Sequence, residues 1–206
     1  MKIFHHIAHI ALMSAVALTV VGCGGNTVSG DAITATNTAR AGHDTATSSS
    51  PTVTNTLPGP HPPPNQNSDG TTFDPCLAYS AAELSKWGLD PATVKDIGAT
   101  TTLQRGCSWQ GDGWYVQQLV INRSISEYLD TNNYPDAKPV AIAGLQGSTH
   151  RLGQSGTAFC SAQIPSQRAV VATLVSLDRP SAQKAIGDAC TKAIEIATDT
   201  VPKLPK

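Results

Sequence analysis

The five cysteines are the residues of this sequence that could form covalent bonds through their side chains, either as disulfides or as a thioether. Cys23 follows an apolar N-terminal run, and the other four lie later in the chain, at Cys76, Cys107, Cys160 and Cys190. An even number of cysteines in an exported domain predicts two disulfides, with three possible pairings. We favour Cys76–Cys107 and Cys160–Cys190. For the second pair, Cys160 falls in an expected strand and Cys190 on the apolar stripe of an expected helix. A zinc site is not expected, since no two of the four lie two to four residues apart.

Residues 1–22 have the parts of an export signal. Lys2 precedes an apolar run over residues 7–21, which at about 15 residues is shorter than the roughly 20 that span a membrane as a helix. The run ends in Val20-Val21-Gly22-Cys23, which resembles the lipobox of bacterial lipoproteins. The resemblance implies cleavage before Cys23 and a diacylglyceryl thioether on its sulfur, and two acyl chains hold a membrane stably where one does not. The alternatives are a cleaved signal with a chance cysteine and a retained transmembrane helix.

We expect residues 23–71 to form a lipidated N-terminus and a disordered tether. Two thirds of residues 24–71 are Gly, Asn, Ser, Thr or Pro. Such a stretch cannot bury enough apolar surface to offset the entropy of ordering it. As a flexible coil it would span on the order of 40 Å, and the proline-rich residues 58–64 should extend it further. Ser and Thr tracts with Pro are also typical of O-glycosylated stalks, an alternative that the intact mass of the native protein would test.

Residues 72–206 have the composition of a globular domain. All three Trp and all four Tyr residues lie here, and acidic and basic side chains are equal in number. This balance argues against nucleic acid as a partner, which requires a clustered basic face, and against polybasic binding to anionic lipids. No constellation of residues indicates a cofactor or a metal. About 135 residues suffice for one modest hydrophobic core.

The apolar pattern and the turn residues predict an α+β domain. Capping boxes at Ser80-Ala-Ala-Glu83 and Ser124-Ile-Ser-Glu127 each begin a helix, and Asp90-Pro91 begins an irregular connection. Strands are expected at about residues 100–110, 114–122, 139–143, 148–152, 158–164 and 168–177. The last strand is apolar on both faces and should be central, and a long helix follows from residue 180 to about residue 199. We therefore expect a mainly antiparallel sheet of five or six strands, packed against an N-terminal helix and a long C-terminal helix, with two disulfides.

Three short motifs carry a resemblance to a known family. They are Phe73-Asp74-Pro75-Cys76, the pairs Glu83-Leu84 and Gly88-Leu89, and Cys107-Ser108-Trp109 before a strand. In these motifs the chain resembles the actinobacterial, often mycobacterial, lipoproteins catalogued as domain of unknown function 3558. The resemblance implies an envelope lipoprotein with one such domain and no defined activity. The chain resembles more distantly extracellular sensor domains with two disulfides, which would make ligand sensing conceivable.

Candidate sites for catalysis and ligand binding are few. The nearest catalytic motif is Gly153-Gln-Ser155-Gly-Thr157 close to His150, but a serine-hydrolase elbow has glycine where Thr157 stands. We therefore interpret the stretch as a turn and expect no enzyme, with a serine hydrolase as the less favoured alternative. Trp109, Trp114 and Tyr115 surround one expected hairpin and could line an apolar ligand pocket, although ordinary core packing also explains them.

The sequence thus predicts a lipoprotein anchored in the cell membrane through Cys23 and facing the extracytoplasmic side. Its domain is expected to be a non-catalytic binding or interaction module of unknown ligand. An envelope protein or a lipid is the partner to be sought. The alternative function is a carrier or sensor of a lipid or another small amphiphile.

Overall fold

The structure, a computed structural model, describes residue 57, residues 61–152 and residues 156–206. All of these residues belong to one compact unit. The expected signal peptide, Cys23, most of the expected tether and Ser155 lie outside the described residues.

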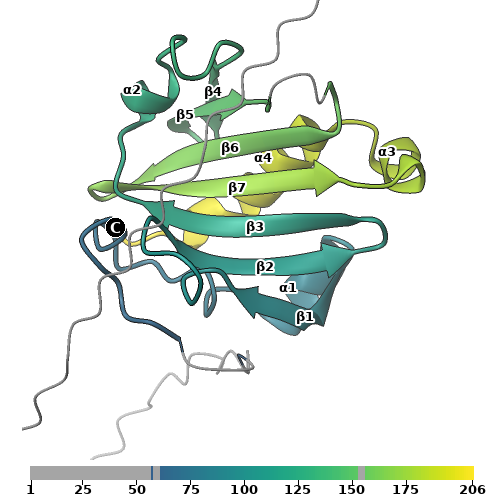
Figure 1. Ribbon diagram of the computed structural model, residues 1–206, viewed down its shortest axis with the longest axis horizontal. Helices are drawn as coiled ribbons and strands as arrows, with labels where there is room; N and C mark the ends of the chain where they lie inside the picture. The colour runs from purple at the N-terminus through teal and green to yellow at the C-terminus, as the bar shows by residue number, and fades with distance from the viewer. Residues whose placement is uncertain (1–56, 58–60, 153–155) are drawn as a thin grey trace, which may run out of the picture. The chain divides into compact units, whose positions relative to one another are not determined.

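Within the described residues, seven antiparallel strands form one sheet (Figure 1). In chain order they are β1 (Leu89–Asp96), β2 (Arg105–Gly111), β3 (Trp114–Ile121), β4 (Lys138–Ile142), β5 (Leu145–His150), β6 (Phe159–Ser166) and β7 (Ala169–Leu177). Across the sheet the order is β1-β2-β3-β7-β6-β5-β4, so β7 is central as predicted. The prediction of an α+β domain is confirmed, but the sheet is larger than the expected five or six strands.

The additional strand is β1, at one edge of the sheet. We expected an irregular connection from Asp90-Pro91 onward, and this expectation was wrong. Proline lacks a backbone N–H and is tolerated in an edge strand, and the register of β1 against β2 shifts between Asp90 and Lys95. Thr93 spans this irregularity, because its hydroxyl donates to the Asp90 carbonyl and accepts from the backbone N–H of Gln110.

Both expected capping boxes are present, and each begins a helix. Ser80 and Glu83 exchange hydrogen bonds at the start of α1 (Ala81–Lys86), and Ser124 and Glu127 do so at the start of α2 (Ile125–Tyr128). α1 packs against β1 at one edge of the sheet (Figure 1). α2 lies near the other edge, against β5 and β6, and so brings the connection between β3 and β4 onto the sheet.

The C-terminal helical region is divided in two. α3 (Pro180–Ile186) ends at Gly187, which has a positive φ of 82°, and α4 (Ala189–Thr200) begins at Asp188. The Asp188 carboxylate accepts hydrogen bonds from the backbone N–H groups of Cys190 and Thr191. The expectation of one long helix was therefore wrong, because a helix-ending glycine and an N-cap aspartate follow one another here. α4 packs on β6 and β7, and the 3₁₀ turn η1 (Val201–Lys203) follows it (Figure 1).

The hydrophobic core contains residues of α1 and α4 and of the face of the sheet that α4 covers. Its largest fully buried side chains include Trp109 of β2, Tyr79 and Leu84 near α1, and Ile196 of α4. The hydroxyls of Tyr79 and Thr200 form a hydrogen bond of 2.9 Å across this core. In the described part of the chain, no helix is both long and apolar enough to cross a membrane.

Two disulfides connect helical or loop segments to strands of the sheet. Cys76–Cys107 attaches the segment before α1 to β2, and Cys160–Cys190 attaches β6 to the first turn of α4. These are the pairings favoured from the sequence. Each joins elements about 30 residues apart in the chain, with separations of 31 and 30 residues.

Candidate functional site

The three aromatic residues proposed from the sequence lie on both faces of the sheet. Trp109 and Trp114 are buried on the helix-covered face, where Trp109 makes an edge contact with Tyr79 and Lys192 Nζ lies 5.8 Å from the Trp114 ring. Tyr115 is half-buried on the opposite face, because successive residues of a strand point to opposite sides. The two tryptophans are thus core residues, and the fold does not gather the three into one cluster.

His150, which the sequence placed near Ser155, is buried at the end of β5. Its Nδ1 lies 3.3 Å from Gln163 Nε2, while Ser155 is outside the described residues. Burial lowers the pKa of His150, and this outweighs the opposite effects of Asp136 and of the Gln163 hydrogen bond. The imidazole is therefore mostly neutral at pH 7.

His150 belongs to an aromatic cluster with Tyr128 and Tyr134. Its ring is stacked with that of Tyr128, with centroids 5.9 Å apart and planes inclined by 14°, and its centroid is 4.5 Å from that of Tyr134. The two tyrosine rings are 5.3 Å apart. His150 pairs with Ser161, the neighbour of the Cys160 that is bonded to α4, so the cluster lies on the face of the sheet that α4 leaves uncovered.

A cavity of about 330 Å³ adjoins the two tyrosines, near the end of β3. We call it the tyrosine pocket, and its lining residues are Asn67, Leu103, Gln104, Ile121, Asn122, Arg123, Tyr128 and Tyr134. Among them only Arg123 is charged. Its Nη1 donates a hydrogen bond of 3.0 Å to the Tyr134 hydroxyl, and its guanidinium carbon lies 6.0 Å from the centroid of the Tyr128 ring. The hydrogen bond and the cation–π contact hold Arg123 against both rings.

Tyr128 contributes to the tyrosine pocket a hydroxyl group that has no partner in the described part of the chain. The residue is 4% exposed, yet among the described residues its hydroxyl forms no hydrogen bond. Burial raises the pKa of Tyr128 to about 12, so the hydroxyl keeps its proton at physiological pH. The half-buried amide of Gln104 also forms no hydrogen bond within the described part of the chain. In the described part of the chain, the buried side-chain atoms without a hydrogen-bond partner are Trp109 Nε1 and Gln118 Oε1. The Tyr128 hydroxyl and the Gln104 amide are not among them, so both keep contact with solvent and are available to a bound molecule.

A second hollow, of about 420 Å³, adjoins the tyrosine pocket. Its lining residues are Arg123, Glu127, Asp130, Asn133 and Tyr134, so Arg123 and Tyr134 belong to both cavities. Asp130 is held in place by hydrogen bonds from the side-chain amides of Asn132 and Asn133. The Tyr134 ring therefore lies between the tyrosine pocket, whose charged lining residue is Arg123, and a hollow to which Glu127 and Asp130 add two acidic groups.

The sequence did not indicate the tyrosine pocket. The capping box at Ser124 predicted the helix that carries Tyr128, which is a local signal. The pocket also needs Asn67 and residues 103–104. The pairing of β2 with β3 brings residues 103–104 to the end of β3, and the backbone hydrogen bond from Asn122 N–H to the Asn67 carbonyl adds Asn67. The proximity of these segments therefore cannot be predicted from the spacing of residues in the sequence.

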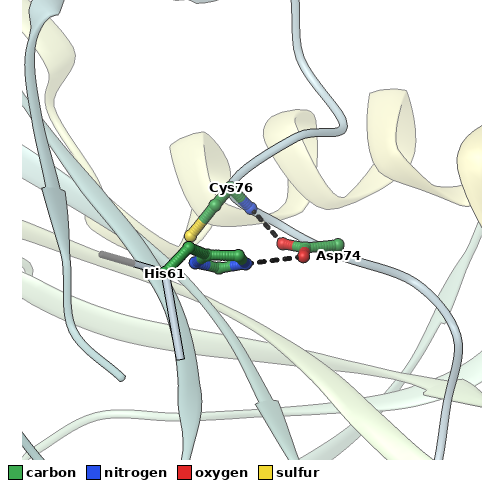
Figure 2. A group of neighbouring side chains, drawn as sticks. All are labelled: His61, Asp74 and Cys76. Atoms are coloured by element: carbon green, nitrogen blue, oxygen red, sulfur yellow. Dashed lines mark hydrogen bonds and ion pairs between the residues drawn. The ribbon is translucent and has the colours of Figure 1, made fainter. Parts of the chain in front are cut away.

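A second polar site surrounds His61 (Figure 2). Nε2 lies 2.7 Å from Asp74 Oδ2, and Nδ1 lies 2.6 Å from Asp96 Oδ2. Both nitrogens donate at once only in the protonated imidazolium. Burial lowers the pKa of His61, but the hydrogen bonds to Asp96 and Asp74 outweigh it, so that the pKa is raised above 6.5. These three residues, which we call the histidine clasp, fasten the chain at residue 61 to the domain.

The histidine clasp borders the Cys76–Cys107 disulfide, which raises the question of a metal. Ligand atoms of His61, Asp74 and Cys76 lie within 4.8 Å of one another, as do those of Cys76, Asp96 and Cys107. However, thiolates and not disulfide sulfurs are zinc ligands, and both cysteines are in the disulfide. Both nitrogens of His61 are also already bonded to carboxylates. The arrangement is accordingly an ion-paired clasp, in which His61 and the two carboxylates satisfy one another.

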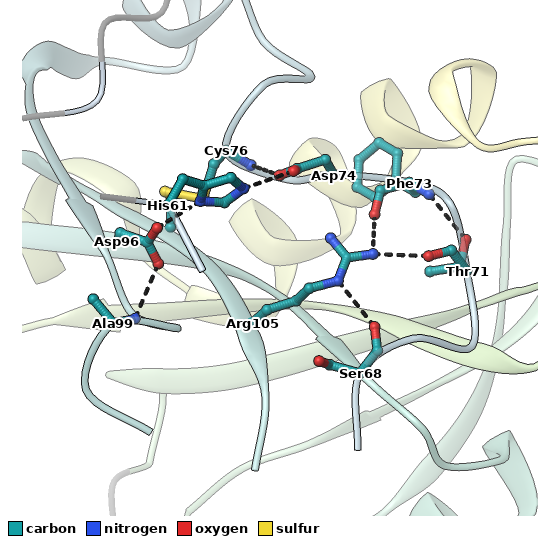
Figure 3. A network of polar contacts seen from close by, with 10 residues as sticks. His61, Ser68, Thr71, Phe73, Asp74, Cys76, Asp96, Ala99 and Arg105 are labelled. Atoms are coloured by element: carbon teal, nitrogen blue, oxygen red, sulfur yellow. Dashed lines mark hydrogen bonds and ion pairs between the residues drawn. A yellow bond between two sulfur atoms is a disulfide. The ribbon is translucent and has the colours of Figure 1, made fainter. Parts of the chain in front are cut away.

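Arg105, the first residue of β2, continues the network along the preceding segment (Figure 3). It is 4% exposed, its Nε donates to the Ser68 carbonyl at 2.9 Å, and its Nη2 donates to the carbonyls of Thr71 at 2.8 Å and Phe73 at 2.6 Å. Composition alone placed residues 61–71 in the tether. The contacts of Arg105 and of the histidine clasp instead attach this segment to the sheet, so the folded part extends upstream of residue 72.

The histidine clasp predicts a pH-dependent contribution to stability. The raised pKa of His61 means that this contribution is fully present below about pH 6.5 and is lost as the pH rises through the folded-state pKa. We expect the difference in free energy of unfolding between wild type and His61→Gln to shrink as the pH rises above 6.5. His150 has a lowered pKa, so its own effect falls below pH 6.5 and is common to both proteins. A difference that stays constant from about pH 6 to pH 9 would contradict the clasp.

Comparison with known proteins gives a family and no activity. The search of curated proteins and the search of solved structures found no match. Residues 18–203 match the family described as "Protein of unknown function (DUF3558)". The match begins within the apolar run before Cys23 and ends close to the C-terminus, so it covers nearly the whole chain. The chain therefore belongs to the DUF3558 family, the one that its cysteine and tryptophan motifs resemble.

Proposed function

We propose that this protein is a cell-envelope lipoprotein, anchored in the cell membrane through acyl chains on Cys23 and facing the extracytoplasmic side. Its domain is a non-catalytic binding module carried on a tether, and its ligand site is the tyrosine pocket. We further propose an actinobacterial, mycobacterial-type origin, which the combination of lipobox, low-complexity tether and this domain supports.

Three observations support the membrane anchor. The lipobox pattern ends at Cys23, and the region that matches the family begins at residue 18 and so includes that cysteine. The other four cysteines are paired in two disulfides, which persist in oxidising compartments outside the cytoplasm. Pairing of those four leaves Cys23 as the odd cysteine of five.

The observation that carries the binding role is the Tyr128 hydroxyl, which lies on a residue lining the tyrosine pocket and has no hydrogen-bond partner among the described residues. Cavities of about 300–1,000 Å³ with a few convergent polar groups are typical of small-molecule sites. If the pocket binds a small ligand, the NMR signals of Tyr128 and Tyr134 should shift at lower ligand concentrations than those of the other tyrosines. A ligand that perturbs only residues elsewhere in the domain would contradict this site.

Replacing Cys23 by alanine should reduce the membrane-bound fraction by about tenfold or more, because stable attachment needs two acyl chains. The measurement is fractionation after an alkaline wash, combined with the intact mass of each protein. The wild-type mass should exceed that of the peptide from Cys23 onward by a diacylglyceryl group. The matched control Thr27→Ala changes a nearby residue of the tether and should stay in the membrane fraction. Cys23→Ala protein that has lost residues 1–22 and still sediments with the membrane would contradict the anchor.

A further inference from the structure

We infer that the tyrosine pocket binds a neutral oligosaccharide, with a sugar ring against Tyr134. This inference rests on the proposed binding role and adds the chemical class of the ligand. It follows from the free hydrogen-bonding groups, the charges and the arrangement of rings around the pocket.

The free polar groups of the tyrosine pocket are both donors and acceptors. Among the described residues, Arg123 uses one N–H on Tyr134 and has four others free. Within the same residues the amide of Gln104 is free, and Asn67 keeps its side-chain oxygen after its Nδ2 donates to the Thr102 carbonyl. The Tyr128 hydroxyl can donate and accept. Asn122 contributes none, because its amide already bonds to the backbone of Gly70 and Gln66 and to Asp69. Sugar hydroxyls, each a donor and an acceptor, match such a mixed set.

The apolar part of the site is formed by ring faces and two aliphatic side chains. Tyr134 is half-buried and borders both hollows, while Leu103 and Ile121 add apolar surface to the tyrosine pocket. An aromatic ring with a polar tip buries a large apolar area and keeps its hydroxyl for hydrogen bonding. The C–H face of a sugar ring suits this surface, and a chain of sugars can continue from one hollow into the other.

Charge argues against the other ligand classes. Arg123 is accompanied by Glu127 and Asp130 in the adjoining hollow, so the combined surface does not favour a polyanion. A ligand cation is disfavoured as well, because Arg123 already occupies the cation–π position over Tyr128. An alkyl chain would desolvate the free groups of Arg123, Gln104 and Tyr128 without pairing them, and this desolvation would weaken its binding.

Fluorine NMR of the full mature lipoprotein in phospholipid nanodiscs can test the inference. The chain has four tyrosines, so 3-fluorotyrosine labelling reports Tyr79, Tyr115, Tyr128 and Tyr134 separately, each assigned by its Tyr→Phe variant. The probes are short oligomers of N-acetylglucosamine and of glucose. We expect the signals of Tyr128 and Tyr134 to shift with saturation, while the core residue Tyr79 and the more distant Tyr115 stay unchanged.

Substitutions then separate the roles of ring and hydroxyl. Tyr134→Ala should weaken oligosaccharide binding by about tenfold or more, because it removes the stacking ring. Tyr128→Phe keeps the ring stack with His150 and removes the free hydroxyl, and should weaken binding by about three- to tenfold. The matched control Tyr115→Ala removes a half-buried tyrosine outside the pocket and should leave affinity unchanged.

Two further probes distinguish failure of the ligand class from failure of the binding role. Saturable shifts with decanoate below its micelle concentration, or with an acidic disaccharide, but not with neutral sugars would overturn the sugar assignment and leave the pocket as a binding site. If none of the probes shifts Tyr128 or Tyr134, the inference is refuted and the binding role loses its support. Neutral oligosaccharides that bind equally well to Tyr134→Ala would refute it too.

Discussion

Replacing Arg105 by methionine is expected to lower the free energy of unfolding by about 3–5 kcal/mol. Arg105 is 4% exposed and donates to three backbone carbonyls of residues 68–73. Methionine fills much of the same volume but leaves those carbonyls without their donor, and hydrogen bonds to a charged group contribute about 1.5–3 kcal/mol each. Release of the desolvation that burial imposes on the guanidinium offsets part of this loss.

Arg105→Met should lower the stability of the whole domain and should also weaken the protection of the segment that Arg105 contacts. Denaturant unfolding of the full mature chain gives the free energy, and amide hydrogen exchange should show faster exchange at residues 67–73 than elsewhere. Arg105→Lys keeps the positive charge, but its single ammonium group cannot donate to all three carbonyls in the way that the planar guanidinium does. We therefore expect Arg105→Lys to lower the free energy of unfolding by about half as much as Arg105→Met.

Arg168→Met is the matched control for Arg105→Met. Arg168 is exposed and its side chain forms no hydrogen bond with the described residues, so its replacement should change the free energy of unfolding by less than about 0.5 kcal/mol. If Arg105→Met were as stable as Arg168→Met, the segment before α1 would not depend on this side chain. That result would contradict the folded boundary upstream of residue 72.

Removing either disulfide by double alanine substitution should lower the free energy of unfolding by about 3–4 kcal/mol. The expectation follows from loop-closure entropy, since the disulfides join residues 31 and 30 positions apart. Because the two separations are nearly equal, the entropic part of the loss is nearly equal for Cys76–Cys107 and Cys160–Cys190. The two loops do not overlap in the chain, so the losses should add when both are removed.

Comparison of the two double variants measures what each disulfide does beyond closing a loop. Cys76 and Cys107 are both fully buried next to the histidine clasp, whereas Cys190 is half-buried. We therefore expect the Cys76→Ala/Cys107→Ala protein to be the less stable of the two and to lose part of the pH dependence that His61 confers. A loss below about 1 kcal/mol for either pair would contradict the loop-closure account.

Features that depend on near neighbours in the chain could be predicted. Ser80 with Glu83 and Ser124 with Glu127 are spaced so that each pair can cap a helix, and both helices are present. The apolar run of β7 predicted a central strand, because a strand buried on both faces must have neighbours and cover. The division of the C-terminal helix was also encoded locally, in Gly187 and Asp188, but the apolar stripe across that point concealed it.

Features that depend on distant segments could not be predicted. β1 becomes a strand because an edge of the sheet was open to it and an edge tolerates Pro91. Residues 61–71 have a tether-like composition, yet they are held because Arg105 and Asp96 lie far along the chain with groups to pair with them. Such pairing depends on the positions of β1 and β2 in the sheet. These positions cannot be predicted from local secondary-structure propensities.

The proposal of an export signal, the odd cysteine and the helix caps follow from residue type and spacing alone, because each depends on residues within a short stretch of the chain. The tyrosine pocket was decided only by tertiary structure. Tyr128, Tyr134 and Gln104 meet because β2 pairs with β3 and α2 packs on β5 and β6. Trp109, which looked from the sequence like a ligand contact, is directed into the core by the same strand pairing, since residues of a strand alternate between its two faces.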